Sequence, residues 1–176
     1  VGGYAVQIAA ALGARVVAVD VNAGQLAAIA PCGASLTLDA STMDFKTLKK
    51  QITASAQQWG CPAHGWTIFE CSGSSAGQET AFGLLGTAGT LMVVGFTLAK
   101  LELRLSNLMA FDATVQGTWG CRPELYPEAL RLVTSGRITL KPFIERHALD
   151  CGAEVLRKVA DHELHRRAIL VPGDHA

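Results

Sequence analysis

Short apolar runs alternate with helical stretches along most of this chain, and this alternation restricts the possible folds more than any other feature. The run at residues 15–20, Arg-Val-Val-Ala-Val-Asp, is rich in β-branched side chains, as are strands that are covered on both faces. Residues 4–12 before it carry apolar side chains at helical spacing, and Gly13 ends that helix. Strands that are separated by helices predict a parallel α/β sheet.

The same alternation continues to the end of the chain. The predicted helices cover residues 4–12, 25–30, 44–58, 78–85, 123–135 and 153–160. The predicted strands cover residues 15–20, 35–38, 66–71, 90–94, 101–105, 114–117 and 168–171. This order predicts a doubly wound parallel sheet, or Rossmann fold, whose first strand is missing from this chain. Because the chain opens at Val1 without a start methionine or a leading strand, we expect it to be a piece of a longer polypeptide.

The composition argues against several functional classes. With 15 Lys and Arg against 15 Asp and Glu, the net charge gives no reason to expect a nucleic-acid or membrane partner. The apolar runs fall far short of the roughly 20 residues that span a bilayer. The 5 cysteines are odd in number and show no C-x-x-C spacing, which argues against a disulfide framework or a structural zinc site. We therefore expect a protein of a reducing compartment, the cytoplasm.

Two glycines and an aspartate form a dinucleotide signal. Gly2 and Gly3 stand where a nucleotide-binding fold needs a turn that lets the backbone approach a pyrophosphate. Asp20 ends the next strand about 20 residues later, where an acid binds ribose hydroxyls. Its carboxylate would repel the 2′-phosphate of NADP, and Val21 and Asn22 add no compensating charge. The sequence therefore predicts NAD as the cofactor.

Several strings are similar to one known family. They are Gly-Gly-Tyr at 2–4, Val-Asp-Val-Asn at 19–22, Phe-Glu-Cys-Ser-Gly at 69–73, Val-Val-Gly-Phe at 93–96, Gly-Thr-Trp-Gly at 117–120 and Arg-Arg-Ala-Ile-Leu at 166–170. Together they resemble the coenzyme domain and C-terminal tail of the zinc-dependent medium-chain alcohol dehydrogenases. The resemblance implies an NAD-binding Rossmann domain, truncated at its start, over residues 1–141. It also implies a tail over residues 142–176 that returns toward a catalytic domain absent from this chain.

The resemblance implies cofactor contacts for residues at the strand ends. The phosphate and ribose end of NAD would be bound by Gly2, Gly3, Asp20, Val21, Asn22 and Arg167. The adenosine side would be lined by Cys71, Ser72 and Gly73. The nicotinamide would be bracketed by Val94, Gly95, Phe96, Thr118 and Trp119. The family's zinc ligands lie before the glycine turn, so neither a catalytic residue nor a metal ligand is assigned in this chain.

Longer strings at residues 69–73, 80–85, 104–112 and 117–121 are similar to a narrower group, the 6-hydroxycyclohex-1-ene-1-carbonyl-CoA dehydrogenases of anaerobic benzoate degradation. This resemblance implies NAD-dependent oxidation of a secondary alcohol on a cyclic hydroxyacyl-CoA to the ketone. The reaction is a hydride transfer in which zinc polarises the alcohol oxygen.

Other function classes stay open. Gly-Ser-Ser-Ala-Gly at 73–77 matches G-x-S-x-G directly after a strand, where an α/β-hydrolase places its nucleophile. Asp112 and His147 follow Ser75 in the hydrolase order of acid and base. A nucleotide-binding or S-adenosylmethionine-binding module would also end its second strand with an acid. His162 and His165 suggest a metal site, but no third ligand stands at a suitable spacing.

Residues 101–105, Leu-Glu-Leu-Arg-Leu, show the clearest period-two alternation in the chain. Leucines on one face and charges on the other predict a half-exposed strand at the edge of the sheet. An unpaired edge is a template for a second chain, and a two-fold axis lets the strand pair with its own copy. We therefore expect a homodimer or homotetramer with these strands paired antiparallel.

Overall fold

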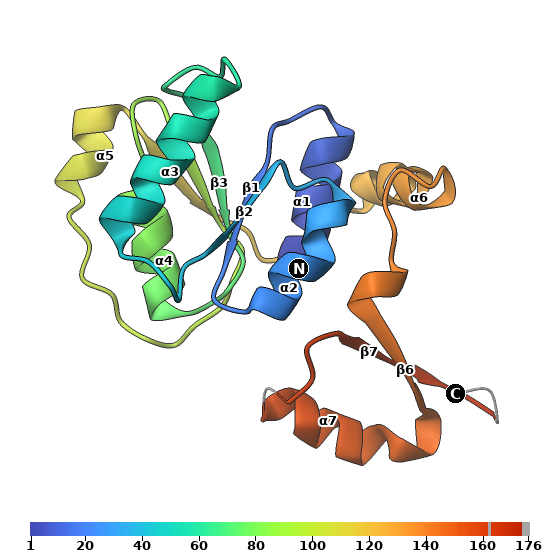
Figure 1. Cartoon of the computed structure of the whole chain (residues 1–176). Coiled ribbons are helices and arrows are strands. Elements are labelled where there is room, and N and C mark those ends of the chain that lie inside the picture. Colours follow the sequence, from blue (N-terminus) through green and yellow to red (C-terminus); the bar gives the residue numbers. More distant parts are fainter. Residues whose placement is uncertain (162, 174–176) are drawn as a thin grey trace.

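Parallel strands and covering helices alternate through the computed structural model, which describes residues 1–161 and 163–173 (Figure 1). The helices are α1 (Gly2–Ala11), α2 (Ala23–Ile29), α3 (Phe45–Gln58), α4 (Ser75–Gly83), α5 (Ser106–Phe111), α6 (Tyr126–Thr134) and α7 (Gly152–Ala160). The strands are β1 (Val17–Asp20), β2 (Leu36–Asp39), β3 (Thr67–Glu70), β4 (Thr90–Val93), β5 (Thr114–Gly117), β6 (Ile144–Ala148) and β7 (Arg167–Val171). The predicted α/β class is confirmed. His162, one of the two histidines weighed as metal ligands, lies outside the described residues.

Hydrogen bonds divide the strands into three parallel sheets, which fits the predicted doubly wound fold without its first strand. β1 pairs with β2, β4 lies between β3 and β5, and β6 pairs with β7. In a doubly wound sheet the first strand lies between the second and the fourth. The described residues contain no strand before α1, so no ladder hydrogen bonds join β1 to β3.

Two apolar clusters hold the helices against the strands. In one cluster Leu85, just after α4, packs with Leu91 of β4, and both side chains are almost fully buried. In the other cluster Leu48 and Ile52 of α3 pack with Leu38 of β2. The two α3 residues are one helical turn apart, so they lie on the same face of the helix. These contacts fix α3 and α4 on one side of the strands (Figure 1).

The helix α1 is held by a segment more than a hundred residues away in the sequence. Gln7 is buried in the middle of α1, and its Nε2 donates to the Thr139 carbonyl at 3.1 Å. Its Oε1 accepts from the Thr139 N–H at 2.8 Å. The Tyr4 ring lies 5.5 Å from the Phe143 ring, centroid to centroid. These contacts join the start of the chain to the segment that leads into β6.

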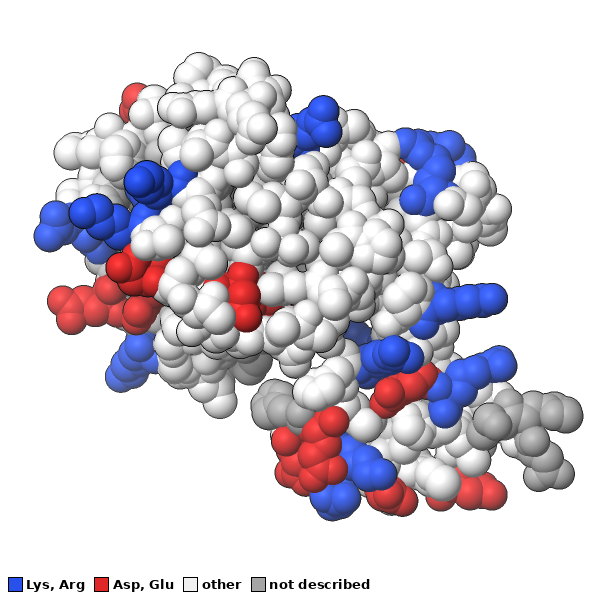
Figure 2. Space-filling view, viewed as in Figure 1, with Lys and Arg blue, Asp and Glu red and all other residues white. Residues whose placement is uncertain are grey.

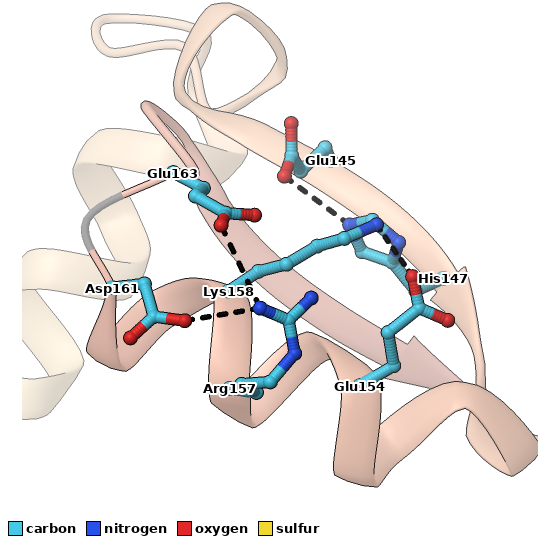
Figure 3. A network of polar contacts seen from close by, with 7 residues as sticks. All are labelled: Glu145, His147, Glu154, Arg157, Lys158, Asp161 and Glu163. Carbon is cyan, nitrogen blue, oxygen red and sulfur yellow. Dashed lines mark hydrogen bonds and ion pairs between the residues drawn. The ribbon is translucent and has the colours of Figure 1, made fainter.

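A network of charged side chains covers the β6–β7 sheet and α7 (Figure 3). Arg157 lies 3.0 Å from Asp161 and 3.6 Å from Glu163, and Lys158 lies 2.6 Å from Glu154. Ion pairs as exposed as these contribute little to stability. Figure 2 shows that charges gather on this part of the molecule, whereas the face over α1 and α2 is almost uncharged.

Residues 101–105 do not form a strand in the single chain, so the prediction of an edge strand is wrong for this structure. The alternation itself is present, because Leu101 and Leu103 line an apolar cavity of about 110 Å³ beside Leu91 and Val115. The charged residues between and after them are exposed. A strand needs a hydrogen-bonding partner, and no strand among the described residues pairs with this segment. Pairing with a second copy stays a prediction.

Asp44, the residue directly before α3, caps the start of that helix and provides a test of helix capping. Asp44 Oδ1 accepts a hydrogen bond from the Thr47 N–H at 2.7 Å, which lowers the pKa of Asp44 below its ordinary value. Its contribution to stability is therefore present above the unfolded pKa of about 3.9 and is lost as the pH falls through the folded pKa. We expect Asp44→Ala to lower the Tm at neutral pH. Asp44→Asn should keep the cap but lose this part of the acid sensitivity.

Thermal unfolding of the two Asp44 variants at neutral and acid pH measures both effects. A Tm of Asp44→Ala equal to that of the unchanged protein at neutral pH would show that the cap contributes nothing.

Candidate functional site

The carboxyl ends of β1, β3, β4 and β5 carry most of the residues that the sequence predicted as a site. Asp20 ends β1, and Cys71, Val94 and Thr118 directly follow the other three strands. The register aligns the ends of β3, β4 and β5, so the residues that follow them lie at one edge of that sheet. Ligands of open parallel α/β sheets bind outside this edge.

The start of α1 lies against the end of β3. A Cβ added to Gly2 would lie 3.5 Å from the Cys71 Cβ, within ordinary contact. Val1, which precedes α1, makes no side-chain cap. The N–H groups of Gly2 and Gly3 have no acceptor within the helix, whereas those of Tyr4 and Ala5 donate to the Val1 carbonyl. Such an end attracts anions. Burial raises the pKa of the Cys71 thiol above its ordinary value.

Gly3 has a different reason to be glycine. A Cβ at this position would lie 2.6 Å from the Phe143 ring, so a side chain there would displace the ring. The sequence assigned Gly3 to the phosphate turn, and the structure gives it a packing role as well.

Asp20 and Asn22 shape the turn from β1 into α2. Asp20 is exposed, and its Oδ1 accepts from the Asn22 N–H at 2.9 Å. The Asn22 side chain in turn caps α2 by accepting from the Gln25 N–H at 3.1 Å. Val21 between them is 69% exposed. The carboxylate therefore stands in solvent at the strand end with its orientation fixed by the turn.

Arg167 lies in a segment that a hydrogen bond holds beside α2. The Gln25 amide donates to the His165 carbonyl at 2.7 Å, which places the segment entering β7 beside α2. Arg167 then pairs in register with Ile144, and its side chain is exposed. Its approach to a pyrophosphate stays a prediction.

The loops after β3 and β4 touch backbone to backbone. Gly73 has a φ of +64°, and a Cβ there would lie 2.5 Å from the Phe96 carbonyl oxygen. A Cβ on Gly95 would clash with the backbone nitrogen of Gly73. Because only glycine lets two backbones approach this closely, both positions require it. The structure thus brings the predicted adenosine and nicotinamide residues into contact.

Two exposed aromatic rings extend the site across β4 and β5. Phe96 is 68% exposed and Trp119 is 91% exposed. Their centroids lie 6.1 Å apart in an edge-to-face arrangement. Thr118, next to Trp119, donates its N–H to the Val93 carbonyl at 3.1 Å, which continues the ladder past β5. The pair offers an apolar surface to a flat ring.

Two residues that the sequence reasoning did not name as site residues hold these loops. Glu70 ends β3 with 4% of its surface exposed, and its carboxylate accepts bonds from Ser72 and Gly73. Gln78 of α4 donates to the Gly95 carbonyl at 3.3 Å. A charged residue directly after the apolar pair Ile68 and Phe69 of a strand is the signal that could have identified Glu70.

The structure does not assemble the hydrolase triad. A hydrolase nucleophile sits on a strained turn, but Ser75 starts α4, and the only described non-glycine residues with positive φ are Ala88 and Asp112. Asp112 precedes β5 and so lies at the amino edge of the sheet, whereas Ser75 follows β3 at the carboxyl edge. His147 lies in β6 with its Nε2 3.2 Å from Glu145. The hydrolase interpretation is therefore wrong.

No three His, Cys, Asp or Glu side chains gather into a possible metal site within residues 1–161 and 163–173. In the same part of the chain, no helix is both long enough and apolar enough to cross a membrane. All five cysteines are free.

A family model described as zinc-binding dehydrogenase matches residues 1–135. Among curated proteins, D-xylulose reductase of Saccharomyces cerevisiae is 25% identical over 107 residues, which are 60% of this chain and 30% of that protein. A putative D-xylulose reductase of Agrobacterium fabrum is 26% identical over 144 residues, which are 81% of this chain and 39% of that protein. The chain thus spans well under half of the length of these relatives.

Solved structures match over almost the whole chain. Galactitol-1-phosphate dehydrogenase of Escherichia coli has a TM-score of 0.82 and 26% identity, over 97% of this chain and 50% of that chain. An alcohol dehydrogenase of Thermotoga maritima has a TM-score of 0.85 and 21% identity, over 98% of this chain and 47% of that chain. The second likeness bears on the fold alone.

Proposed function

This chain belongs to the zinc-binding dehydrogenase family, and on that basis we propose that it supplies the coenzyme site of an NAD-dependent alcohol dehydrogenase. The observation that carries the proposal is the exposed Asp20 carboxylate at the carboxyl end of β1. The start of α1 against the end of β3 and the Gly73–Gly95 contact support it. In this proposal residues 1–141 form the NAD-binding domain and residues 142–176 form the tail.

The residues present fit NAD. The N–H groups at the start of α1, at Gly2 and Gly3, would bind the pyrophosphate with help from Arg167. Asp20 would accept hydrogen bonds from the ribose hydroxyls, as acids in this position do in dinucleotide folds. The backbone of residues 71–73 would line the adenosine side. The nicotinamide would lie among residues 94–96 and 118–119, where the two exposed rings would shield it from water.

Bound NAD would take a hydride from the carbon of a secondary alcohol. The residues of this chain would bind the cofactor, fix its orientation and exclude water from its ring. The family also implies zinc, but the described residues supply no set of ligands for it, so no step is assigned to a metal in this chain.

Among secondary alcohols, the substrate that we propose is a cyclic hydroxyacyl-CoA, 6-hydroxycyclohex-1-ene-1-carbonyl-CoA. It would be oxidised to its ketone in the degradation of aromatic compounds. The strings at residues 69–73, 80–85, 104–112 and 117–121 support this choice. The relatives described above carry names that refer to xylulose and galactitol phosphate and not to an acyl-CoA. They therefore support oxidation of an alcohol in general, and the acyl-CoA is the narrower part of the proposal. We also propose that the protein is cytoplasmic and that it forms a homodimer or homotetramer through residues 101–105.

Titration of the 176-residue chain with NADH, NADPH and S-adenosylmethionine tests the cofactor class. We expect weak but saturable binding of NADH, seen as quenching of tryptophan fluorescence, and no oxidation of alcohols, because the described residues hold no metal site. The exposed Trp119 should carry part of the signal, so Trp119→Phe should reduce the quenching more than Trp59→Phe. Preferential binding of S-adenosylmethionine, or alcohol oxidation by this chain, would contradict the prediction.

A further inference from the structure

Glu70 is a buried carboxylate whose bonds all go to one short turn. Its Oε1 accepts from the Ser72 N–H at 2.7 Å, from the Ser72 hydroxyl at 2.6 Å and from the Gly73 N–H at 3.1 Å. The turn leads directly into α4, where Ser74 caps the helix by accepting from the Gly77 N–H at 3.0 Å. Glu70 therefore fixes the conformation of residues 71–74.

The burial of this carboxylate needs an explanation, because buried charges are costly without a partner. Among the described residues Glu70 forms no ion pair with Lys, Arg or His. The donors on Oε1 and the positive end of α4 offset part of the cost. The other oxygen, Oε2, is buried and has no hydrogen-bond partner within the part of the chain that the structure describes.

The unpaired oxygen faces Gly95. A Cβ on Gly95 would lie 2.7 Å from Oε2, so the carboxylate occupies the space that a side chain at this position would need. The main-chain carbonyl of Glu70 also accepts from the N–H groups of Val94 and Gly95, both at 2.9 Å. One residue thus holds the turn after β3 with its side chain and the loop after β4 with its backbone.

We propose that Glu70 is a positioning residue of the coenzyme site, which sets the affinity for NAD without touching it. By fixing residues 71–74 against Gly95, it keeps the adenosine side and the nicotinamide side of the site in one arrangement. The inference rests on the proposed function, since it concerns the same site. It adds a residue whose side chain points into the fold rather than toward the cofactor.

Two variants separate the contributions of the carboxylate. Glu70→Ala removes the acceptor and leaves the N–H groups of Ser72 and Gly73 without their partner. We expect NADH binding to weaken about tenfold, the effect of losing a hydrogen bond to a charged group. Glu70→Gln keeps one acceptor oxygen in a side chain of the same shape, so it should restore most of the affinity. Fluorescence titration of the full chain well below its Tm measures both dissociation constants.

A control variant distinguishes positioning from a general loss of stability. Leu85→Val shortens a fully buried side chain in the cluster beneath α4 and lies away from the loops. It should lower the Tm and leave the NADH dissociation constant unchanged. If it weakens NADH binding as much as Glu70→Ala does, or if Glu70→Ala binds NADH like the unchanged chain, the proposal is overturned.

Amide hydrogen exchange gives a readout that does not depend on the cofactor. In Glu70→Ala the amides of Ser72 and Gly73 should exchange faster, and in Leu85→Val they should not. Unchanged exchange in Glu70→Ala would overturn the positioning role. If the unchanged chain shows no saturable NADH binding, the proposed function fails, and the exchange data still show whether Glu70 holds the turn.

Discussion

Replacing Asp20 with glycine is expected to weaken NAD binding by roughly tenfold to a hundredfold, the range for losing hydrogen bonds to a charged acceptor. The same change should strengthen NADP relative to NAD, because the carboxylate no longer repels the 2′-phosphate. The structure places this carboxylate at the exposed end of β1 without a cationic neighbour in its turn. Dissociation constants for the two cofactors, measured with the same preparation of protein, give the ratio directly.

Two further variants make the Asp20 result specific. Asp20→Asn keeps an acceptor for the Asn22 N–H and removes only the charge, so it should relax the discrimination with less damage to the turn. Asp39 ends the neighbouring strand in register with Asp20 and accepts from the Ser41 N–H at 2.8 Å in a similar turn. Asp39→Gly should leave the ratio of NAD to NADP affinity unchanged. If Asp20→Gly leaves the ratio of NAD to NADP affinity unchanged, Asp20 serves only to form the turn and the prediction is contradicted.

Gly95→Ala is expected to produce the largest loss of stability among the changes considered. The added methyl group would meet the Gly73 backbone and Glu70 Oε2, neither of which is the free end of a flexible side chain. Overpacking of this kind costs about 3 kcal/mol. For a chain of this size such a loss lowers the Tm by roughly 10 °C. Binding of NADH should fall in the same variant, because the two loops separate.

Gly86→Ala is the matched control for Gly95→Ala. Gly86 also follows a structural element, but a Cβ there meets no atom within 4 Å and its φ is not positive. The same substitution should therefore be neutral or slightly stabilising at Gly86. Equal Tm values for the two variants would mean that the Gly73–Gly95 contact is looser than the structure shows.

Elements with local signals could be predicted from the sequence. The strand at residues 114–117 was predicted with the bounds that the structure has, and Asp44 stands as the N-cap where the helix over residues 44–58 was expected to begin. In both cases the pattern that predicts the element lies in the residues that form it. The prediction of a ribose-binding acid at Asp20 has a similar local basis, because the acid and the glycines lie at a characteristic spacing.

Elements that depend on distant partners could not be predicted. The strand β6 carries three ionisable side chains in five residues, and its pairing with β7 joins segments about twenty residues apart. The helix α5 is six residues long, too short to show a helical period. Gln7 and Glu70 are buried polar residues, and only the folded chain shows which groups satisfy them. For Gln7 that partner is Thr139, at the other end of the sequence.

The separation of the β1–β2 pair from the β3–β4–β5 sheet bears on what a bound dinucleotide would link. Among the described residues no ladder hydrogen bonds join the two sheets. A dinucleotide held at Asp20 beside one sheet and near Phe96 beside the other would contact both. Its binding would therefore raise the stability of both sheets together.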